Sequence, residues 1–157
     1  MKPTKIRDFV GAIAVVFDFS AATKQEALEK LGTRSSLLIP GLRADEITRG
    51  LLDRERLGST GIGDGKAIPH AKFPDLAHIF LLFARSKEGV PFDAVDHRPV
   101  HAFFLLLAPD NSSSDYLKVL ARVSRLLKHP GFMEKVLAAE DESQIERLII
   151  QIDESIP

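Results

Sequence analysis

The sequence predicts an α/β fold: a single three-layer α/β/α domain with a mixed β-sheet, covering residues 1–157. Segments with the pattern of strands alternate with helical segments early in the chain, and helical segments dominate late, which favours a mixed sheet with helices on both faces. The 157 residues suffice for one domain that buries about 68–70% of its unfolded surface. Hydrophobic residues make up 45% and charged residues 27%, as in ordinary globular proteins.

The first element is an apolar run over residues 9–17, which has two interpretations. Basic residues precede the run, as in a secretory signal peptide: Lys2, Lys5 and Arg7. The run is also rich in strand formers such as Val15 and Val16, and a first buried β-strand explains it equally well. Asp8 and Asp18 bracket the run closely, and we expect the strand.

Two helices are predicted next. Thr23 and Glu26 form a capping-box pattern that opens the first helix, whereas Gly32 leaves the length of that helix open. A Pro-Gly pair at 40–41 breaks the chain, and residues 44–57 then show the spacing of an amphipathic helix. This second helix leads directly into a glycine-rich segment.

Two short apolar runs follow the glycine-rich segment, at residues 79–84 and 100–107. Their nearly continuous hydrophobicity predicts central strands that are covered on two faces, with 92–99 as their connection. The last third changes to a helical period and predicts three helices: from the capping residues 112–115 to about Lys128, over 132–139, and over 144–152.

The glycine-rich segment runs from Gly58 to His70, and four glycines fall within its first eight residues. Clustered glycines let main-chain N–H groups approach an anion, and Pro69 stiffens the backbone before His70. A P-loop is excluded because Thr60 and Ala67 stand where its first glycine and its Ser or Thr must be. The dinucleotide-binding pattern fails because the segment follows a helix rather than a strand. We therefore interpret the segment as an anion cradle beside a rigidly held imidazole.

Four sequence blocks, in order, resemble enzyme IIA of the fructose/mannitol class in the bacterial phosphotransferase system, most closely its nitrogen-type regulatory branch. The blocks are Leu52–Glu55, Gly58–His70, Phe92–Val100 and Leu105–Pro109. The resemblance implies one α/β domain with a mixed sheet between helices. It also implies that His70 carries a phosphoryl group received from an HPr-like phosphocarrier protein.

The chemistry of His70 can be argued from the residues. Unperturbed histidine titrates at about 6.5, so a neutral imidazole can attack phosphorus without a separate base. We expect a backbone carbonyl to hold the other ring nitrogen. Charge on the phosphoryl oxygens must be compensated, and we expect amides of the glycine run and one guanidinium to do so. The amides belong to Gly61, Gly63 and Gly65.

The charged run at 54–56 by itself favours a surface arginine, but Arg54 matches the family's arginine that steadies the phosphohistidine, and this resemblance favours a role in the site. Ser59 and Thr60 either donate hydroxyls to phosphate or close turns through local backbone bonds. Tyr116 stands where many family members have a second histidine, and it either donates a hydrogen bond to phosphate or only packs there.

Charged residues elsewhere have simpler interpretations. Several basic side chains share one face of the predicted helix that ends near Lys128: Lys118, Arg122, Arg125 and His129. This face is either simply solvated or a docking surface for an acidic protein. His97 and His101 are separated by Pro99, which argues against the helix that a zinc pair needs. We expect no metal and no cofactor.

The sequence thus predicts a phosphotransferase component with a phosphohistidine intermediate, used mainly for nitrogen or metabolic regulation through phosphorylation-dependent protein binding. The alternative is a sugar-transport enzyme IIA that passes phosphate to a fructose- or mannitol-type enzyme IIB. The expected partners are the HPr-like carrier and either regulatory target proteins or an enzyme IIB.

Other partners and locations are not expected. The net charge of -1 gives nucleic-acid binding no electrostatic support. No run approaches the roughly 20 apolar residues of a membrane span. The absence of cysteine is compatible with the cytoplasm, where we expect this protein.

Overall fold

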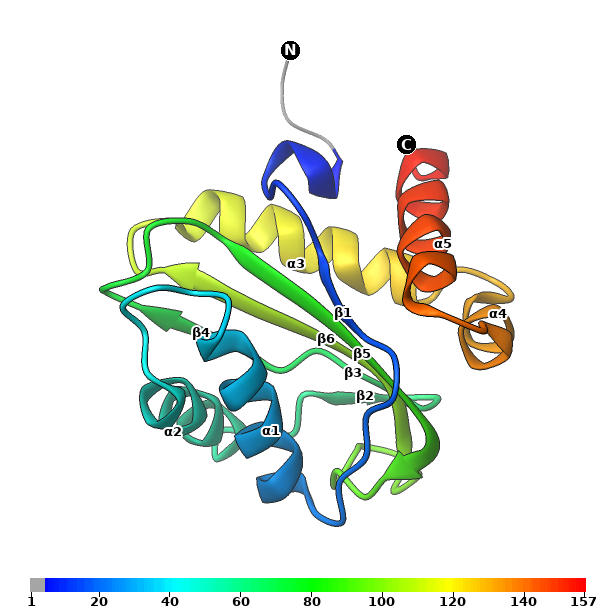
Figure 1. Ribbon diagram of the computed structural model, residues 1–157, viewed down its shortest axis with the longest axis horizontal. Helices are drawn as coiled ribbons and strands as arrows, with labels where there is room; N and C mark the ends of the chain where they lie inside the picture. Colours follow the sequence, from blue (N-terminus) through cyan, green and yellow to red (C-terminus); the bar gives the residue numbers. More distant parts are fainter. Residues whose placement is uncertain (1–4) are drawn as a thin grey trace.

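The computed structural model describes residues 5–157 and shows a six-stranded mixed sheet with helices on both faces (Figure 1). The elements in chain order are η1 (Ile6–Asp8), β1 (Ala14–Val16), α1 (Lys24–Ser36), α2 (Ala44–Glu55), β2 (Gly61–Gly63), β3 (Lys66–Ala67), β4 (His70–Phe73), β5 (Phe80–Val90), β6 (Val100–Pro109), α3 (Ser113–Leu127), α4 (Phe132–Ala138) and α5 (Glu142–Ser155). The predicted α/β fold and mixed sheet are confirmed.

The long antiparallel pair β5–β6 forms the middle of the sheet. β1 lies parallel to β5 on one side, and β3 and β4 both lie parallel to β6 on the other, with β2 at the edge. The strand order is β1-β5-β6-β3-β2, with β4 paired to β6. β5 and β6 are therefore the central strands that the two apolar runs predict.

β5 extends six residues beyond its predicted end at Ala84. The extension begins with polar residues, and Arg85 is nevertheless only 1% exposed. Its guanidinium donates to carbonyl oxygens of Phe17 at 3.1 Å and Ala139 at 2.8 Å, which satisfies the buried charge with hydrogen bonds. A hydrophobicity pattern cannot anticipate a strand that continues through a buried arginine.

Side chains of the central strands alternate between two hydrophobic clusters, as the period of a strand requires. Phe103 and Leu105 belong to the cluster that α1 and α2 cover. Phe104 and Leu106 belong to the cluster that α3, α4 and α5 cover (Figure 1). Each face of the sheet therefore has its own core.

The first helix passes through Gly32 without interruption. Thr23 Oγ1 accepts a hydrogen bond from the Glu26 amide at 3.1 Å, so the predicted cap is present. A Cβ at Gly32 would lie 2.5 Å from Oγ1 of Thr48 on α2. Gly32 therefore permits the close approach of α1 and α2 and does not end the helix.

The apolar run at 9–17 is only partly a strand. β1 contains three residues and begins at Ala14, beside Leu82 of β5. Phe9 and Ile13 precede the strand and pack against the core beneath α3 and α5 instead of joining the sheet. The prediction of a strand is correct, but the extent of its burial is wrong. Lys2, which belongs to the signal-peptide interpretation, lies outside the described residues.

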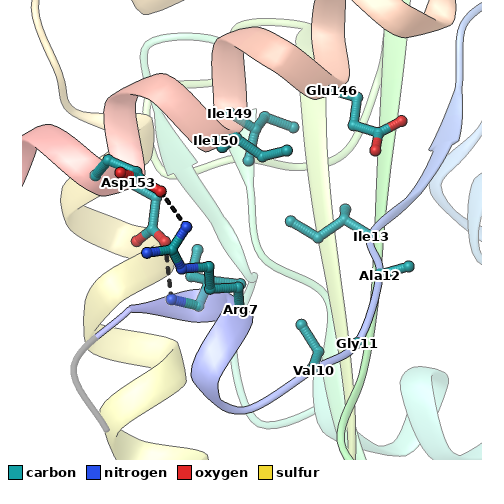
Figure 2. Close-up of a pocket in the computed structure, with 11 residues that line it drawn as sticks. Arg7, Val10, Gly11, Ala12, Ile13, Glu146, Ile149, Ile150 and Asp153 are labelled. Carbon is teal, nitrogen blue, oxygen red and sulfur yellow. Dashed lines mark hydrogen bonds and ion pairs between the residues drawn. The ribbon is translucent and has the colours of Figure 1, made fainter.

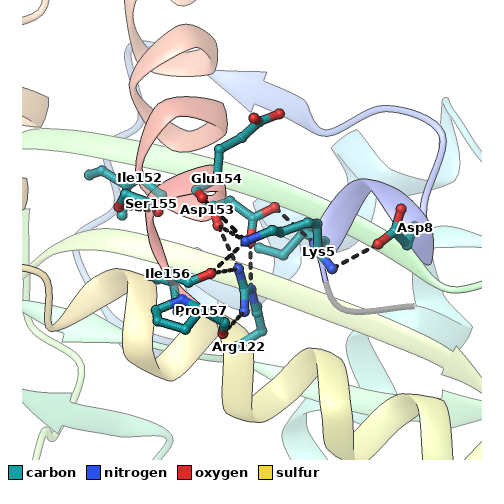
Figure 3. Close-up of polar contacts among 10 residues, drawn as sticks. Lys5, Asp8, Arg122, Ile152, Asp153, Glu154, Ser155, Ile156 and Pro157 are labelled. Atoms are coloured by element: carbon teal, nitrogen blue, oxygen red, sulfur yellow. Dashed lines mark hydrogen bonds and ion pairs between the residues drawn. The ribbon is translucent and has the colours of Figure 1, made fainter. Parts of the chain in front are cut away.

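Arg122 does not belong to the exposed basic face that the sequence predicts on α3, because it is buried, with an exposed fraction of 7%, whereas Lys118 and Arg125 are exposed. Arg122 Nε donates to Asp153 Oδ1 at 2.7 Å, and its terminal nitrogens donate to the carbonyl oxygens of Ile156 and Pro157 (Figure 3). Lys5 Nζ also donates to the Ile156 carbonyl, at 2.6 Å. Within the last turn of α5, the Asp153 carbonyl accepts from Arg122 and the Glu154 carbonyl from Lys5, so the two cations stabilise the C-terminal end of this helix.

The helices of the last third begin and end close to their predicted positions, except for α5. Asp141 caps α5 by accepting a hydrogen bond from the Gln144 amide at 2.8 Å, so the helix starts two residues earlier than predicted. The helix also continues to Ser155. Among residues 5–157, no helix combines the length and the apolar character needed to cross a bilayer.

Candidate active site

His70 is the first residue of β4 and is half-buried at the edge of the sheet. It pairs with Leu106 of the buried strand β6, and the Leu106 amide donates to the Pro69 carbonyl at 2.9 Å. Helix α2 packs closely on β4. The absence of a side chain at Gly50 permits this, since a Cβ there would lie 2.8 Å from the Phe73 ring. This packing brings the C-terminal end of α2 beside the imidazole.

The two ring nitrogens of His70 have different partners. Nδ1 lies 2.7 Å from the Ile68 carbonyl oxygen, which is the backbone carbonyl that the sequence leads us to expect. Nε2 accepts a hydrogen bond from Arg54 Nε at 3.1 Å. A guanidinium can only donate, so Nε2 carries the lone pair and Nδ1 carries the proton. The tautomer leaves Nε2 as the nucleophilic atom.

Burial lowers the pKa of His70 below its usual 6.5. The hydrogen bond to the Ile68 carbonyl acts in the opposite direction, and the positive charge of Arg54 lowers the pKa further. The net effect favours the neutral imidazole at neutral pH. Only this form can attack an electrophile.

Arg54 is held in place by the turn that follows α2. Its Nη1 donates to the Gly58 carbonyl at 2.9 Å, while its Nε contacts His70. The structure thus brings together the two residues that the sequence singles out, and Arg54 is not a free surface residue. Its role toward a phosphoryl group remains a prediction.

The glycine-rich segment, which the sequence leads us to interpret as an anion cradle, contains two short strands. It forms the β2–β3 hairpin, in which Gly61 pairs with Ala67 and the Ile68 amide donates to the Thr60 carbonyl at 3.0 Å. The chain after Ala67 continues into β4 along the same central strand, β6. Very short strands rich in glycine lack the side-chain alternation that reveals a strand in a sequence.

Two of the cradle glycines lie far from the imidazole. Lys66 pairs with Ala102, and His70 pairs with Leu106 four residues farther along β6. At 3.3 Å per residue, this register separates Lys66 from His70 by roughly 13 Å. Gly63 ends β2 and Gly65 lies in the turn at that distant end, so both are too far away for direct contact with a group on His70.

The two hydroxyl residues before the hairpin differ. Ser59 Oγ accepts a hydrogen bond from the Gly61 amide at 3.0 Å and donates to the Phe92 carbonyl at 3.4 Å, which is the turn-closing arrangement. Thr60 Oγ1 is buried and has no hydrogen-bond partner among the residues described. A buried hydroxyl without a partner is unusual, and Ser35 Oγ is in the same situation away from this site.

Tyr116 of α3 and Lys72 of β4 border the other side of His70. The rings of His70 and Tyr116 have centroids 6.0 Å apart, and burial raises the pKa of the phenol, which keeps it neutral. Lys72 Nζ lies 4.7 Å from the centre of the Tyr116 ring and 3.2 Å from Ser113 Oγ. Lys72 is not among the site residues predicted from the sequence, although it lies two residues after His70 and hence on the same face of the strand.

Other cavities and side-chain clusters lie away from this site. A cavity of about 100 Å³ opens between the η1–β1 segment and α5 (Figure 2). Aliphatic side chains such as Val10, Ile13 and Ile149 line it, and it contains none of the predicted site residues. Within residues 5–157, no group of three or more histidine or acidic side chains is arranged to hold a metal ion.

Comparisons with known proteins agree on one family. The profile of the family "Phosphoenolpyruvate-dependent sugar phosphotransferase system, EIIA 2" matches residues 9–152. A nitrogen regulatory protein of Bradyrhizobium diazoefficiens is 39% identical over 140 residues, which cover 89% of this chain and 91% of the relative. A fructose-specific EIIA component of Haloferax volcanii is 36% identical over 136 residues, covering 85% and 86%.

A solved structure shows the same relationship. The crystal structure of nitrogen regulatory protein IIA-Ntr from Neisseria meningitidis superimposes with a TM-score of 0.80 at 28% identity. The match covers 88% of this chain and 97% of that protein.

Proposed function

The chain belongs to the EIIA 2 family of the phosphoenolpyruvate-dependent sugar phosphotransferase system, and from this premise we propose that it accepts a phosphoryl group on Nε2 of His70 from an HPr-like carrier. One observation carries the proposal. The Ile68 carbonyl holds Nδ1 of a neutral imidazole at the edge of the sheet, so the lone pair on Nε2 points toward Arg54. We further propose that residues 1–157 act as one domain.

The transfer is a displacement at phosphorus. The Nε2 lone pair of His70 forms the new N–P bond while the N–P bond in the donor's phosphohistidine breaks, and the donor imidazole keeps the bonding electrons. The proton on Nδ1 stays on the ring, where the Ile68 carbonyl accepts its hydrogen bond at 2.7 Å. Phosphoryl transfer of this kind depends mainly on alignment and on charge compensation.

Arg54 supplies the compensating charge. Its Nε occupies the position in front of Nε2, so the guanidinium must shift to admit phosphorus and can then donate to the phosphoryl oxygens. The bond from Nη1 to the Gly58 carbonyl limits that shift and keeps the side chain close to His70.

Thr60 is the second proposed phosphate contact. The Ile68 amide donates to the Thr60 carbonyl, one residue beyond the Gly61–Ala67 pair, so by strand alternation we expect the Thr60 side chain on the same face as that of His70. Diagonal neighbours on one face are about 7–8 Å apart, within reach of a phosphoryl group on the ring. The free hydroxyl of Thr60 supports this role, whereas Ser59 already closes a turn. Tyr116 either donates to phosphate or only packs beside the ring.

A regulatory use is favoured by the match to a nitrogen regulatory protein at 39% identity. Phosphorylation adds a charge of about -2 at His70, and exposed apolar side chains follow its two neighbours in the chain: Leu57 after Arg54 and Leu117 after Tyr116. We expect the added charge to change how a protein partner binds this surface. The fructose-specific relative supports the alternative, in which the phosphoryl group passes to an enzyme IIB. Pulldowns with phosphorylated and unphosphorylated protein would discriminate between regulatory targets and an enzyme IIB.

The carrier function is tested by incubation with phosphoenolpyruvate, enzyme I and an HPr-type carrier, followed by intact mass measurement before and after acid treatment. We expect one acid-labile phosphoryl group on the wild type and none on His70→Ala. His78→Ala changes an exposed histidine and serves as the matched control. An unchanged wild-type mass, with donors that are active on another acceptor, would refute the proposal.

A further inference from the structure

Glu55 is a buried carboxylate that the proposed transfer step does not use. It is the last residue of α2, directly after Arg54, and its side chain is only 5% exposed. Both carboxylate oxygens accept from the Thr60 amide, at 3.1 and 3.2 Å. A buried charge is retained only where hydrogen bonds or an opposite charge compensate for its lost hydration.

The opposite charge comes from another helix. Lys24, the first residue of α1, places Nζ 2.7 Å from Glu55 Oε1, and the Lys24 side chain is 19% exposed. The same ammonium lies 5.0 Å from the ring centre of Phe92, whose carbonyl accepts the Ser59 hydroxyl. Glu55 and Lys24 therefore connect the start of α1, the end of α2 and the connection after β5.

Arg54 and Glu55 bind the same short turn from two sides. Arg54 donates to the Gly58 carbonyl, and Glu55 accepts from the Thr60 amide two residues later. The Gly58 carbonyl orients the guanidinium on His70, whereas the Thr60 amide fixes the residue that carries the unpartnered hydroxyl. A displaced turn would move both groups away from the imidazole.

We propose that Glu55 is a positioning residue for phosphoryl transfer: with Lys24 as its counter-ion, it fixes the 58–60 turn so that Arg54 and Thr60 face His70. This inference rests on the proposed phosphocarrier function. Lys24 has a second effect, because it balances a negative charge that would otherwise oppose a phosphoryl dianion on the nearby imidazole.

The test compares Glu55→Ala, Glu55→Gln and the control Asp53→Asn, which changes an exposed carboxylate of the same helix. Phosphoryl acceptance is measured by rapid quench with a phosphorylated HPr-type carrier. Glu55→Ala removes a charge-assisted hydrogen bond and is expected to slow acceptance by about 10–100-fold. Glu55→Gln keeps one oxygen for the Thr60 amide, and we expect it to restore most of the rate.

Two NMR measurements on the unphosphorylated protein separate positioning from a general loss of stability. The Thr60 amide of Glu55→Ala should exchange its hydrogen faster, whereas core amides of β6 keep their protection. The His70 titration should shift to lower pH in both Glu55 variants, because the carboxylate's negative charge stabilises the imidazolium.

The possible failures are distinguishable. A wild type that takes up no phosphoryl group refutes the proposed function. A Glu55→Ala protein with wild-type acceptance, or with unchanged Thr60 exchange and His70 titration, overturns the positioning role. If Glu55→Ala does not fold, the inference depends on Glu55→Gln, which offers the Thr60 amide one neutral oxygen in place of two charged ones; an unchanged Thr60 exchange rate in that variant would overturn it.

Discussion

Replacing Arg54 tests the geometry around His70 directly. The guanidinium uses two different nitrogens, with Nε 3.1 Å from His70 Nε2 and Nη1 2.9 Å from the Gly58 carbonyl. A hydrogen bond to a charged group contributes roughly 1.5–3 kcal/mol. Because 1.4 kcal/mol corresponds to about a factor of ten, Arg54→Ala should slow phosphoryl acceptance by about 10–150-fold.

The conservative variant makes the prediction sharper. Arg54→Lys keeps the charge, but one ammonium cannot reproduce the planar fork that donates to the Gly58 carbonyl and to the phosphoryl oxygens at the same time. We expect Arg54→Lys to remain at least several-fold slower than the wild type. If only a positive charge were required, Arg54→Lys would instead accept the phosphoryl group at the full wild-type rate.

The assay is rapid-quench labelling from a phosphorylated carrier, with the half-life of the acid-labile adduct measured separately. Arg56→Ala is the control, since Arg56 is exposed and pairs with Asp53 on the helix surface. Thermal unfolding should be nearly unchanged in both variants because neither arginine is part of a core. Equal labelling rates and adduct lifetimes for Arg54→Ala and the wild type would remove Arg54 from the site.

Three further predictions concern charge, pH and packing. Lys72→Met should slow phosphoryl acceptance a few-fold, and the effect should be larger at low than at high ionic strength because the ammonium is exposed. A variant that is slowed by the same factor at both salt concentrations would contradict this. Because the pKa of His70 is lowered, the rate of phosphoryl acceptance should persist at pH 6.5. The contribution of His70 to the free energy of unfolding should decrease as the pH falls below 6.5, because the unfolded state then binds the proton more readily than the folded state. In urea titrations at several pH values, His70→Gln should lack that part of the decrease. Gly32→Ala would place a Cβ 2.5 Å from Thr48 Oγ1. The cost of overpacking, about 1–3 kcal/mol, should exceed the gain of about 1 kcal/mol in helix propensity, so the variant should unfold at a lower urea concentration. Adding Thr48→Ala should partly restore the urea midpoint.

The sequence predicted elements whose side chains follow a clear period. β6 is an almost uninterrupted run of buried residues, and the cap at Thr23 is marked by its hydroxyl and by Glu26. β2 and β3 could not be found in this way because strands of two or three residues, rich in glycine, have no measurable alternation. Arg122 looks solvated on a helical wheel, and its burial depends on partners more than thirty residues away, such as Asp153 and the Ile156 carbonyl.

The candidate site was predicted unevenly. The pairing of Arg54 with His70 came from resemblance, since no periodicity connects residues sixteen positions apart. Lys72 follows from the alternation of a strand once β4 is known. Glu55 was missed as a site residue because a charged run at the end of a helix normally faces solvent. Its burial depends on Lys24, which lies in another helix.

The position of Arg54 and Glu55 as neighbours on α2 limits how this protein can change over evolution. Successive residues of a helix point about 100° apart, and here these two directions reach the two ends of one turn. A single codon inserted or deleted between Gly50 and Arg54 would rotate both side chains away, even if every amino acid of the motif were kept. Lineages can therefore exchange residues along this part of the helix, but they cannot alter its length by one.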